Sequence, residues 1–195
     1  MITTPAPARL RVLCALAATT ATLLCICCPH WFTWRPDWNG HTLAAAEQGN
    51  VMLLARSLSG GGSVAARDEV GLTPLILASR SGHVSCLRLL LDHGADINAT
   101  AGVYGTALQQ AAMNCRYEVI ELLLAAGADP DIAGDYHTPP LLMAITTGDV
   151  HVVRALIAAG ADVNARGLGN RSMLQLALDF EKPHLVDELI AAGAR

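Results

Sequence analysis

The sequence predicts an all-α repeat solenoid, because three sets of residues recur at a fixed interval of 33 positions. The triplet Gly-Ala-Asp is found at 94–96, 127–129 and 160–162. Leucine and alanine keep the same register, at Leu75, Leu108, Leu141 and Leu174 and at Ala78, Ala111, Ala144 and Ala177. A period of this size, with an apolar stripe in every unit, is typical of supersecondary units that stack on their neighbours to bury a shared core.

Composition agrees with such a stack. Hydrophobic residues make up 52 % of the chain and charged residues 15 %, a balance that excludes a disordered protein. Only 4 % of the residues are aromatic. The core is therefore expected to consist of Leu, Ala and Val in thin helical layers.

Each unit is expected to contain two helices. In the clearest unit the first helix starts at Thr73-Pro74, since a Thr hydroxyl can cap free backbone amides and Pro suits the first turn. Gly82 ends that helix, because glycine readily adopts the left-handed conformation. A second helix is expected from 84 to 93, and Gly94 ends it in the same way. Asp96 and its neighbours favour turns, so a hairpin-like loop is expected to project toward the next unit.

The motifs of this unit point to one family. They are Gly71-x-Thr73-Pro74-Leu75-x-x-Ala78, Gly82-His83, Leu89-Leu90-Leu91 and Gly94-Ala95-Asp96-Ile97-Asn98. Together they resemble the ankyrin repeat. The resemblance implies stacked helix-turn-helix repeats with projecting β-hairpin-like loops. It also implies a non-enzymatic module that binds another protein through the loop tips and the concave face of the stack.

The resemblance covers residues 41 to 195 and divides them into five repeats, at about 41–66, 67–99, 100–132, 133–165 and 166–195. In the first repeat, Gly60, Gly61, Gly62 and Ser63 replace the Gly-Ala-Asp triplet, and we expect them to loosen the loop. The last repeat is expected to act as a cap, since terminal repeats are usually atypical.

Two features depart from the family pattern. The His that usually follows Pro-Leu in the family is replaced in all four downstream repeats, by Ile76, Gln109, Leu142 and Gln175. The hydrogen bonds that this His usually makes between loops must therefore come from other residues or be absent. The turn glycine is replaced by Cys115 in repeat three and by Glu181 in repeat five.

Residues 1–33 do not belong to the stack and are expected to be a signal peptide or a transmembrane anchor. Arg9 and Arg11 precede residues 12–28, seventeen uncharged and mostly apolar residues. As a helix this run is about 26 Å long, just short of the roughly 30 Å hydrocarbon core, so a cleaved signal and a retained anchor are both possible by length. A packed helix outside the membrane is the third alternative. Residues 34–40 are interpreted as a connector.

The flanks of the apolar run favour an anchor. Trp31, Trp34 and Trp38 follow the run, where an aromatic belt meets the interface, and the basic residues precede it. The repeats are then expected on the non-cytoplasmic side, which is the periplasm in a bacterium, or outside the cell after signal cleavage. Lipid attachment at Cys25, Cys27 or Cys28 is another alternative. Such cysteines are more often simple small hydrophobes.

No group of residues predicts catalysis, a cofactor or a metal site. His83 and Cys86 are three positions apart on one helix, but no second pair follows at a metal-binding spacing. Cys86 and Cys115 lie on neighbouring repeats, and whether they pair stays open. The acidic cluster of Asp129, Asp131 and Asp135 is interpreted as turn-forming. The Gly60–Gly62 run lacks the Lys that phosphate loops need.

Charge argues against a nucleic-acid partner. Residues 41–195 hold ten Lys and Arg against sixteen Asp and Glu, a net charge of −6. A surface that binds phosphates needs the opposite sign. The expected partner is therefore another protein, with the membrane as a second contact through residues 12–28 if they are not cleaved.

The resemblance also implies which residues meet the partner. They belong to the loop tips and to the exposed side of the first helices: Val70, Leu72, Arg80, Ser81, Tyr104, Met113, Asn114, Tyr136, His137, Thr146, Arg171 and Phe180. Several are apolar or aromatic where a solvated tip would be polar. Two alternatives stay open, since the tips can instead pack on one another, and the partner can be an exported enzyme or toxin that the protein assists or inhibits in an immunity-like role.

Overall fold

The computed structural model describes residues 37–135 and 138–195, and within these ranges it contains ten α-helices. The helices are α2 Trp38–Gln48, α3 Val51–Ser59, α4 Pro74–Ser81, α5 Val84–Asp92, α6 Ala107–Met113, α7 Tyr117–Ala125, α8 Pro140–Thr147, α9 Val150–Ala158, α10 Met173–Asp179 and α11 Pro183–Ala191. Two short 3-10 helices, η1 Gly102–Tyr104 and η2 Leu168–Asn170, lie in the loops.

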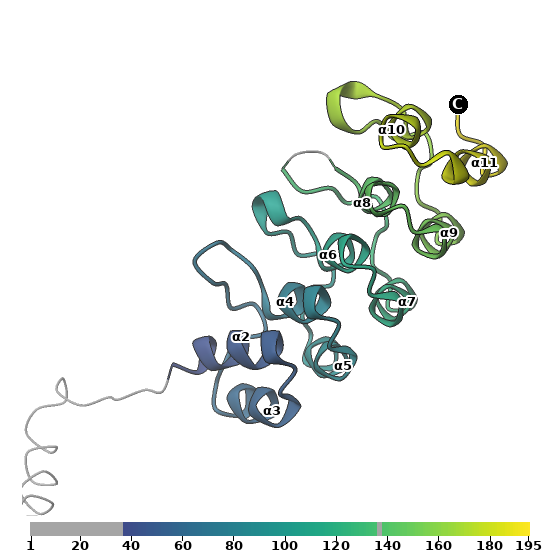
Figure 1. The fold of residues 1–195 in the computed structure, drawn as a ribbon. Coiled ribbons are helices and arrows are strands. Elements are labelled where there is room, and N and C mark those ends of the chain that lie inside the picture. Colours follow the sequence, from purple (N-terminus) through teal and green to yellow (C-terminus); the bar gives the residue numbers. More distant parts are fainter. Residues whose placement is uncertain (1–36, 136–137) are drawn as a thin grey trace, which may run out of the picture. The chain divides into compact units, whose positions relative to one another are not determined.

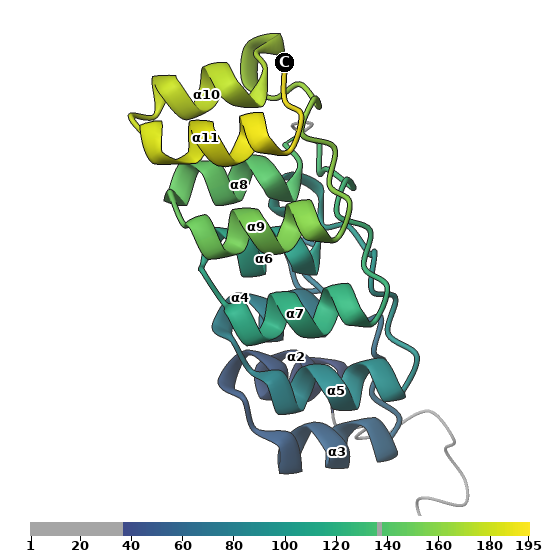
Figure 2. The same ribbon diagram turned by 90° about the vertical axis from the view of Figure 1, so that its right-hand side faces the viewer.

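The ten helices form five antiparallel pairs stacked in chain order (Figure 1). The even-numbered helices contact one another from α2 to α10 and form one row, and the odd-numbered helices from α3 to α11 form a second row. Figure 2 shows the second row in front, with the loops gathered along one side of the stack. The predicted all-α repeat stack is confirmed.

The caps of repeat two are those that its sequence predicts. The Thr73 hydroxyl accepts a hydrogen bond from the Ile76 amide at 3.3 Å, and Pro74 begins α4. Gly82 ends α4 with a φ of 89°. Gly94 follows α5 with a φ of 78°. The amides of residues 94 and 95 donate back to the last turn of α5, so its final carbonyls are satisfied.

Two repeats make the same turn without glycine. Cys115 and Glu181 occupy the turn position of repeats three and five, with φ values of 51° and 57°. A side chain in this left-handed region is strained, because its Cβ approaches the neighbouring carbonyl oxygen. The helix before each turn begins with a reciprocal cap instead of proline, Thr106 with Gln109 in α6 and Ser172 with Gln175 in α10.

Repeat one differs from its prediction in two ways. Helix α2 begins at Trp38, inside the predicted connector 34–40, because the Asp37 carboxylate caps it by accepting the Gly40 amide at 2.9 Å. The glycine run after α3 is not a loose loop. A Cβ on Gly60 would lie 2.6 Å from the Trp38 ring, and one on Gly62 would lie 2.9 Å from the Ser57 carbonyl oxygen. Gly60 and Gly62 are required because the chain packs tightly under α2 at these two positions.

The core is a continuous apolar layer between the two rows of helices. Its centre is built from Leu, Ile, Val and Ala, as the composition predicts. The positions that lack the family's His adapt in two ways. Ile76 and Leu142 are fully buried in this layer. Gln109 donates through Nε2 to the Thr138 carbonyl of the next repeat, so one inter-repeat hydrogen bond is retained.

A ladder of hydrogen bonds runs along the exits of the second helices. The side-chain oxygens of Asn98, Asp131 and Asn164 accept the amides of Asp129, Asp162 and Arg195 in the following repeats, at 2.8 to 3.0 Å. Within each repeat, the Asp two positions earlier accepts the amide of the Asn or Asp itself. Side chains and backbone therefore alternate in one chain of bonds from repeat two to repeat five.

Among the described helices, none combines the length and the apolar character that crossing a bilayer requires. The predicted membrane segment, residues 12–28, lies outside the described residues.

Candidate protein-binding surface

The loops that project from the stack are tight hairpins. In repeat two, Asp68 organises the turn: its carboxylate accepts the amides of Val70 at 3.0 Å and Leu72 at 2.8 Å. In repeat three, the Ala101 amide donates to the Gly105 carbonyl at 2.9 Å and closes the hairpin around η1. Repeat five closes in the same way, with the Gly167 amide donating to the carbonyl of Arg171 at 3.0 Å. The tips of repeats two, three and five are therefore held by hydrogen bonds within their own hairpins.

The tips present apolar side chains to solvent. Val70 is 54 % exposed and Tyr104 is 39 % exposed. Two further tip residues were missed from the sequence, Val103 at 54 % and Leu168 at 41 %. Val103 could have been found, because it stands 33 positions after Val70. Leu168 has no apolar equivalent at this period. Tyr136 and His137, at the tip of repeat four, lie outside the described residues.

Leu72 was wrongly assigned to the exposed tip. Its side chain is only 2 % exposed and belongs to the core. The reason is its place directly before the N-cap Thr73, from which a hydrophobic residue packs back against the first turns of the helix. Leu72 therefore anchors the hairpin to the stack and is not available to a partner.

The predicted first-helix residues form a second group. Arg80, Ser81, Met113, Asn114, Thr146 and Phe180 lie at or just beyond the carboxyl ends of α4, α6, α8 and α10. Met113 and Asn114 are exposed, and the other four are half-buried. The hydroxyl of Thr146 donates to the Met143 carbonyl at 2.7 Å, so it is held within its own helix.

The loop-tip residues and the residues at the carboxyl ends of the first helices lie apart in most repeats. The tips precede the amino ends of the first helices, and the second group lies at their carboxyl ends. A helix of seven or eight residues separates the two by about 10 to 12 Å. In repeat five the gap is bridged, because the loop residue Arg171 forms an ion pair with Asp179 at the end of α10.

The loops of repeats three and four touch beside the tip of repeat three. The Asp135 amide donates to the Gly102 carbonyl at 3.1 Å. A Cβ on Gly134 would lie 2.7 Å from that same carbonyl oxygen, so only glycine permits this approach. The contact is between backbones, while the side chains of Val103 and Tyr104 at the tip stay exposed. The loops of repeats three and four therefore support one another through their backbones.

Comparison with protein families identifies these repeats. A model described as ankyrin repeats in three copies matches residues 42–134, and a model of the single ankyrin repeat matches residues 137–168. The chain belongs to the ankyrin repeat family. A comparison with curated proteins found no match. Ankyrin repeat domains are generally non-catalytic modules that typically bind other proteins.

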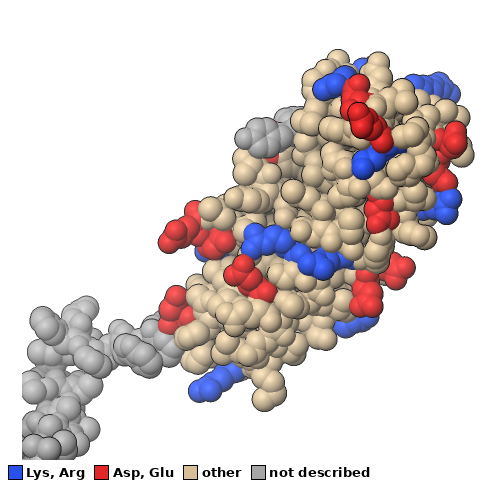
Figure 3. Space-filling model, viewed as in Figure 1, with Lys and Arg blue, Asp and Glu red and all other residues tan. Residues whose placement is uncertain are grey.

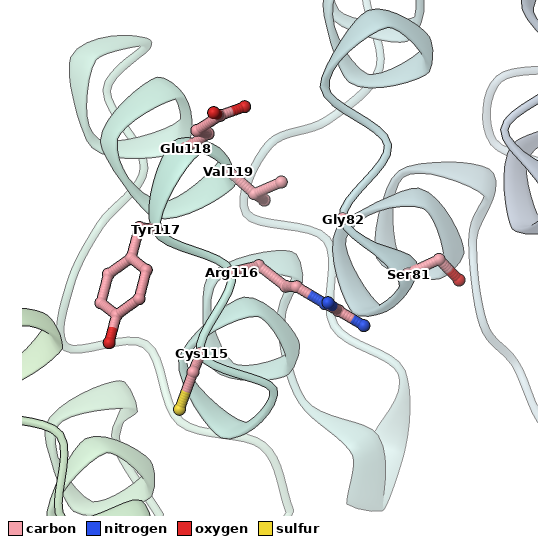
Figure 4. Close-up of a pocket in the computed structure, with 7 residues that line it drawn as sticks. All are labelled: Ser81, Gly82, Cys115, Arg116, Tyr117, Glu118 and Val119. Atoms are coloured by element: carbon pink, nitrogen blue, oxygen red, sulfur yellow. The ribbon is translucent and has the colours of Figure 1, made fainter.

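A shallow groove lies at the turn between repeats two and three of this ankyrin stack. It has a volume of about 230 Å³ and is lined by Ser81, Gly82, Cys115, Arg116, Tyr117, Glu118 and Val119 (Figure 4). The Arg116 side chain extends across Gly82, and its Nε donates to the Arg80 carbonyl at 3.2 Å. Arg116 thus joins the second group of predicted residues to the next repeat.

The residues that suggested chemistry have structural roles in the ankyrin fold. His83 bonds through Nε2 to the Glu47 carbonyl at 3.1 Å, and burial raises the pKa of the Cys86 thiol. Cys86 and Cys115 are both free thiols. Asp129 and Asp131 accept backbone amides of the ladder. Over residues 37–135 and 138–195, no three His, Cys, Asp or Glu side chains are grouped so that they could hold a metal ion.

The charges of the ankyrin stack are mixed on the face that Figure 3 shows. Blue and red side chains alternate over it, and neither sign forms a large patch. Within residues 37–135 and 138–195, ion pairs join Arg80 with Glu47, Arg154 with Glu188 and Arg171 with Asp179. The first two connect neighbouring repeats. A partner meeting the face in Figure 3 finds charges of both signs.

Proposed function

We propose that this ankyrin repeat domain is a non-enzymatic module that binds another protein through its loop tips. The observation that carries the proposal is the exposure of apolar side chains at the described tips of repeats two, three and five, at Val70, Val103, Tyr104 and Leu168. An apolar side chain at a tip gains contact area when a partner covers it, and exposed apolar groups often mark interaction sites. Tyr is also enriched among residues that dominate binding energy.

The rigidity of the hairpins supports the same proposal. Backbone hydrogen bonds close each described tip, and Asp68 adds two side-chain bonds in repeat two. A preformed loop loses little conformational entropy when it binds. The ends of the first helices, with exposed Met113 and Asn114, form a second contact region on the same repeats.

Site-specific photo-crosslinking tests the tips. A photoreactive residue replaces Tyr104 in one variant of the full chain and Met52 in another. Met52 is an exposed apolar residue on α3, away from the loops, and serves as the control. We expect a discrete crosslinked protein from position 104 and none from position 52. Equal crosslinking at both positions would contradict binding by the tips.

The affinity of variants for the captured protein then measures how much each tip side chain contributes to binding. Tyr104→Ala and Val103→Ala are expected to weaken binding by about 1 kcal/mol or more each, since they remove exposed side chains without opening the core. Met52→Ala is expected to leave affinity unchanged. Reduced thermal stability with unchanged affinity of the folded fraction would assign the tips to the scaffold.

We further propose that residues 12–28 hold the domain at a membrane, with the repeats on its non-cytoplasmic side. The support is the order of basic residues, apolar run and tryptophans in the sequence. Reporters fused after Arg195 test the orientation. An inactive alkaline phosphatase together with an active cytoplasmic reporter at the same point would reverse it. Sequencing the amino terminus of the mature protein distinguishes a retained anchor from a cleaved signal.

A further inference from the structure

The hairpins of repeats two and three follow one another along the loop side of the stack, before α4 and α6 (Figure 1). Each presents a valine at the same position of the repeat, Val70 in one and Val103 in the other, and both side chains are exposed. Tyr104 adds an exposed ring next to Val103. Neighbouring helices pack about 8 to 10 Å apart, so equivalent tips are expected on the order of 10 Å from each other. A single partner surface can therefore cover both tips.

Arg67 connects these two hairpins. Its Nη1 atom donates to the Gly71 carbonyl of its own hairpin at 2.7 Å and to the Thr100 carbonyl at the start of the next hairpin at 2.9 Å. Bonds from a charged donor are stronger than neutral ones. Among the described residues, no other hydrogen bond joins residues 67–72 to residues 100–105. The position of one tip relative to the other therefore depends on this side chain.

The equivalent arginine of repeat five makes the first of these contacts without the second. Arg166 stands three repeat periods after Arg67, and its Nη1 atom donates to the Asn170 carbonyl of its own hairpin at 2.8 Å. In the part of the chain that the structure describes, it makes no hydrogen bond to another repeat. The two arginines thus share the bond within the hairpin and differ in the bond between repeats, which makes Arg166 a matched control for Arg67.

The exposure of Arg67 limits what its bonds contribute to folding. The side chain lies at the surface, where water competes for the same donors and acceptors. Each hairpin is also anchored separately, since Leu72 in one and Ala101 in the other are buried in the core. Loss of the Arg67 bonds is therefore expected to leave the fold intact and to change the relative position of the two tips.

We propose that Arg67 is a positioning residue that joins the hairpins of repeats two and three into one preformed contact unit. In this unit Val70, Val103 and Tyr104 meet the same surface of the partner together. The inference rests on the proposed binding through the tips, and it adds which tips act together and which side chain holds them. Two tips that are already held at a fixed spacing lose less conformational entropy on binding than two independent tips.

The distance between the tips tests the connection without a partner. Nitroxide labels on genetically encoded residues at positions 70 and 103 of the full chain, in a mild detergent, report this distance by electron paramagnetic resonance. We expect Arg67→Met to broaden the distance distribution at an unchanged melting temperature, and Arg67→Lys, which keeps a cationic donor, to give an intermediate result. An unchanged distribution in Arg67→Met overturns the proposal.

Label mobility separates the bond between repeats from the bond within the hairpin. A single label at position 70 is compared with and without Arg67→Met, and a single label at position 168 with and without Arg166→Met. Both substitutions remove a bond within the hairpin, and only Arg67→Met also removes the bond to the next repeat. The gain in mobility is therefore expected to be larger at position 70. Equal gains at the two positions would also overturn the proposal.

The affinity for the protein captured through position 104 tests the functional part. We expect Arg67→Met to weaken binding by about three- to tenfold, since the two tips must then be ordered during binding. Arg166→Met is expected to cause a smaller loss. An unchanged affinity in Arg67→Met, or equal losses in both variants, contradicts a positioning role. If position 104 captures no protein, the proposed function fails, while the label distances still decide whether Arg67 joins the hairpins.

Discussion

Repeats two and five follow the same plan with different local support. Repeat two has the Thr73 cap, glycine at the turn and a neighbour on both sides. Repeat five has a side chain at positive φ in Glu181, and within the part of the chain that the structure describes it has a neighbour on one side, repeat four. The fold survives both losses, because each repeat gains stability from its intrinsic bonds and from each interface it makes. The difference teaches that, within the described stack, repeat five should be less stable than repeat two.

The largest expected loss of stability comes from truncating one buried leucine in each of the two repeats. Leu90 and Leu189 are equivalent and both fully buried. We expect Leu90→Ala to lower the free energy of unfolding by about 2 to 5 kcal/mol, and Leu189→Ala to lie near about 2 kcal/mol, since one side of its repeat can relax. Urea unfolding followed by circular dichroism measures both. Equal losses in the free energy of unfolding would contradict a difference in stability between repeats two and five.

The turn position gives effects of opposite sign in the two repeats. Gly82→Ala is expected to cost about 1 to 2 kcal/mol, because it forces a side chain into the left-handed region and toward Arg116. Glu181→Gly is expected to stabilise by about 1 kcal/mol, since it relieves the same strain. Thermal melts of the two variants measure both changes in stability. A destabilised Glu181→Gly variant would show that the Glu181 side chain makes a compensating contact.

The ladder lies between the two repeats and tests how they are joined. Asp131 accepts the Asp162 amide at 2.8 Å. Asp131→Ala is expected to cost about 1 kcal/mol, the usual contribution of one hydrogen bond. Asp131→Asn keeps an acceptor oxygen and serves as the matched control, with little change expected. If both variants melt alike, the bond contributes nothing to the free energy of unfolding.

The smallest effect concerns pH at the junction of repeats four and five. Arg154 donates to the carboxylate of Glu188 through Nε at 3.0 Å and through Nη2, which lowers the pKa of Glu188 from its ordinary 4.5. Stability from this pair is fully present above about pH 4.5 and is lost as the pH falls through the lowered pKa. An NMR titration of Glu188 should show its pKa rise toward the ordinary value in Arg154→Ala. An unchanged pKa would mean that the pair does not form in solution.

Much of the fold could be predicted because local chemistry repeats. Thr73, Gly82 and Gly94 each act through bonds within a few residues, so the sequence alone places the helix ends of repeat two. The start of α2 was missed although Asp37 carries the cap signal, because the residues around it were interpreted as a connector. The need for glycine at positions 60 and 62 could not be predicted from the sequence, since it depends on the packing of Trp38.

The candidate surface was predicted less well, because exposure depends on tertiary packing. Val70 and Leu72 are both apolar and two positions apart, yet one faces solvent and the other the core. No local pattern separates them without the hairpin geometry. The ladder shows the same limit, since Asn98 was interpreted only as a turn former and its bond reaches 31 positions along the chain.

The ladder also decides how the stack responds to a mechanical load. Its bonds hold the amide of one repeat to a side chain of the repeat before it, ending where Asn164 accepts the Arg195 amide at 2.9 Å. A pull applied at Arg195 unzips these bonds one after another, so the last bond carries the tension first and the next is loaded only after it breaks. We expect the domain to peel from its carboxyl end one repeat at a time, in steps of about 33 residues of released chain, when it is stretched in an optical trap.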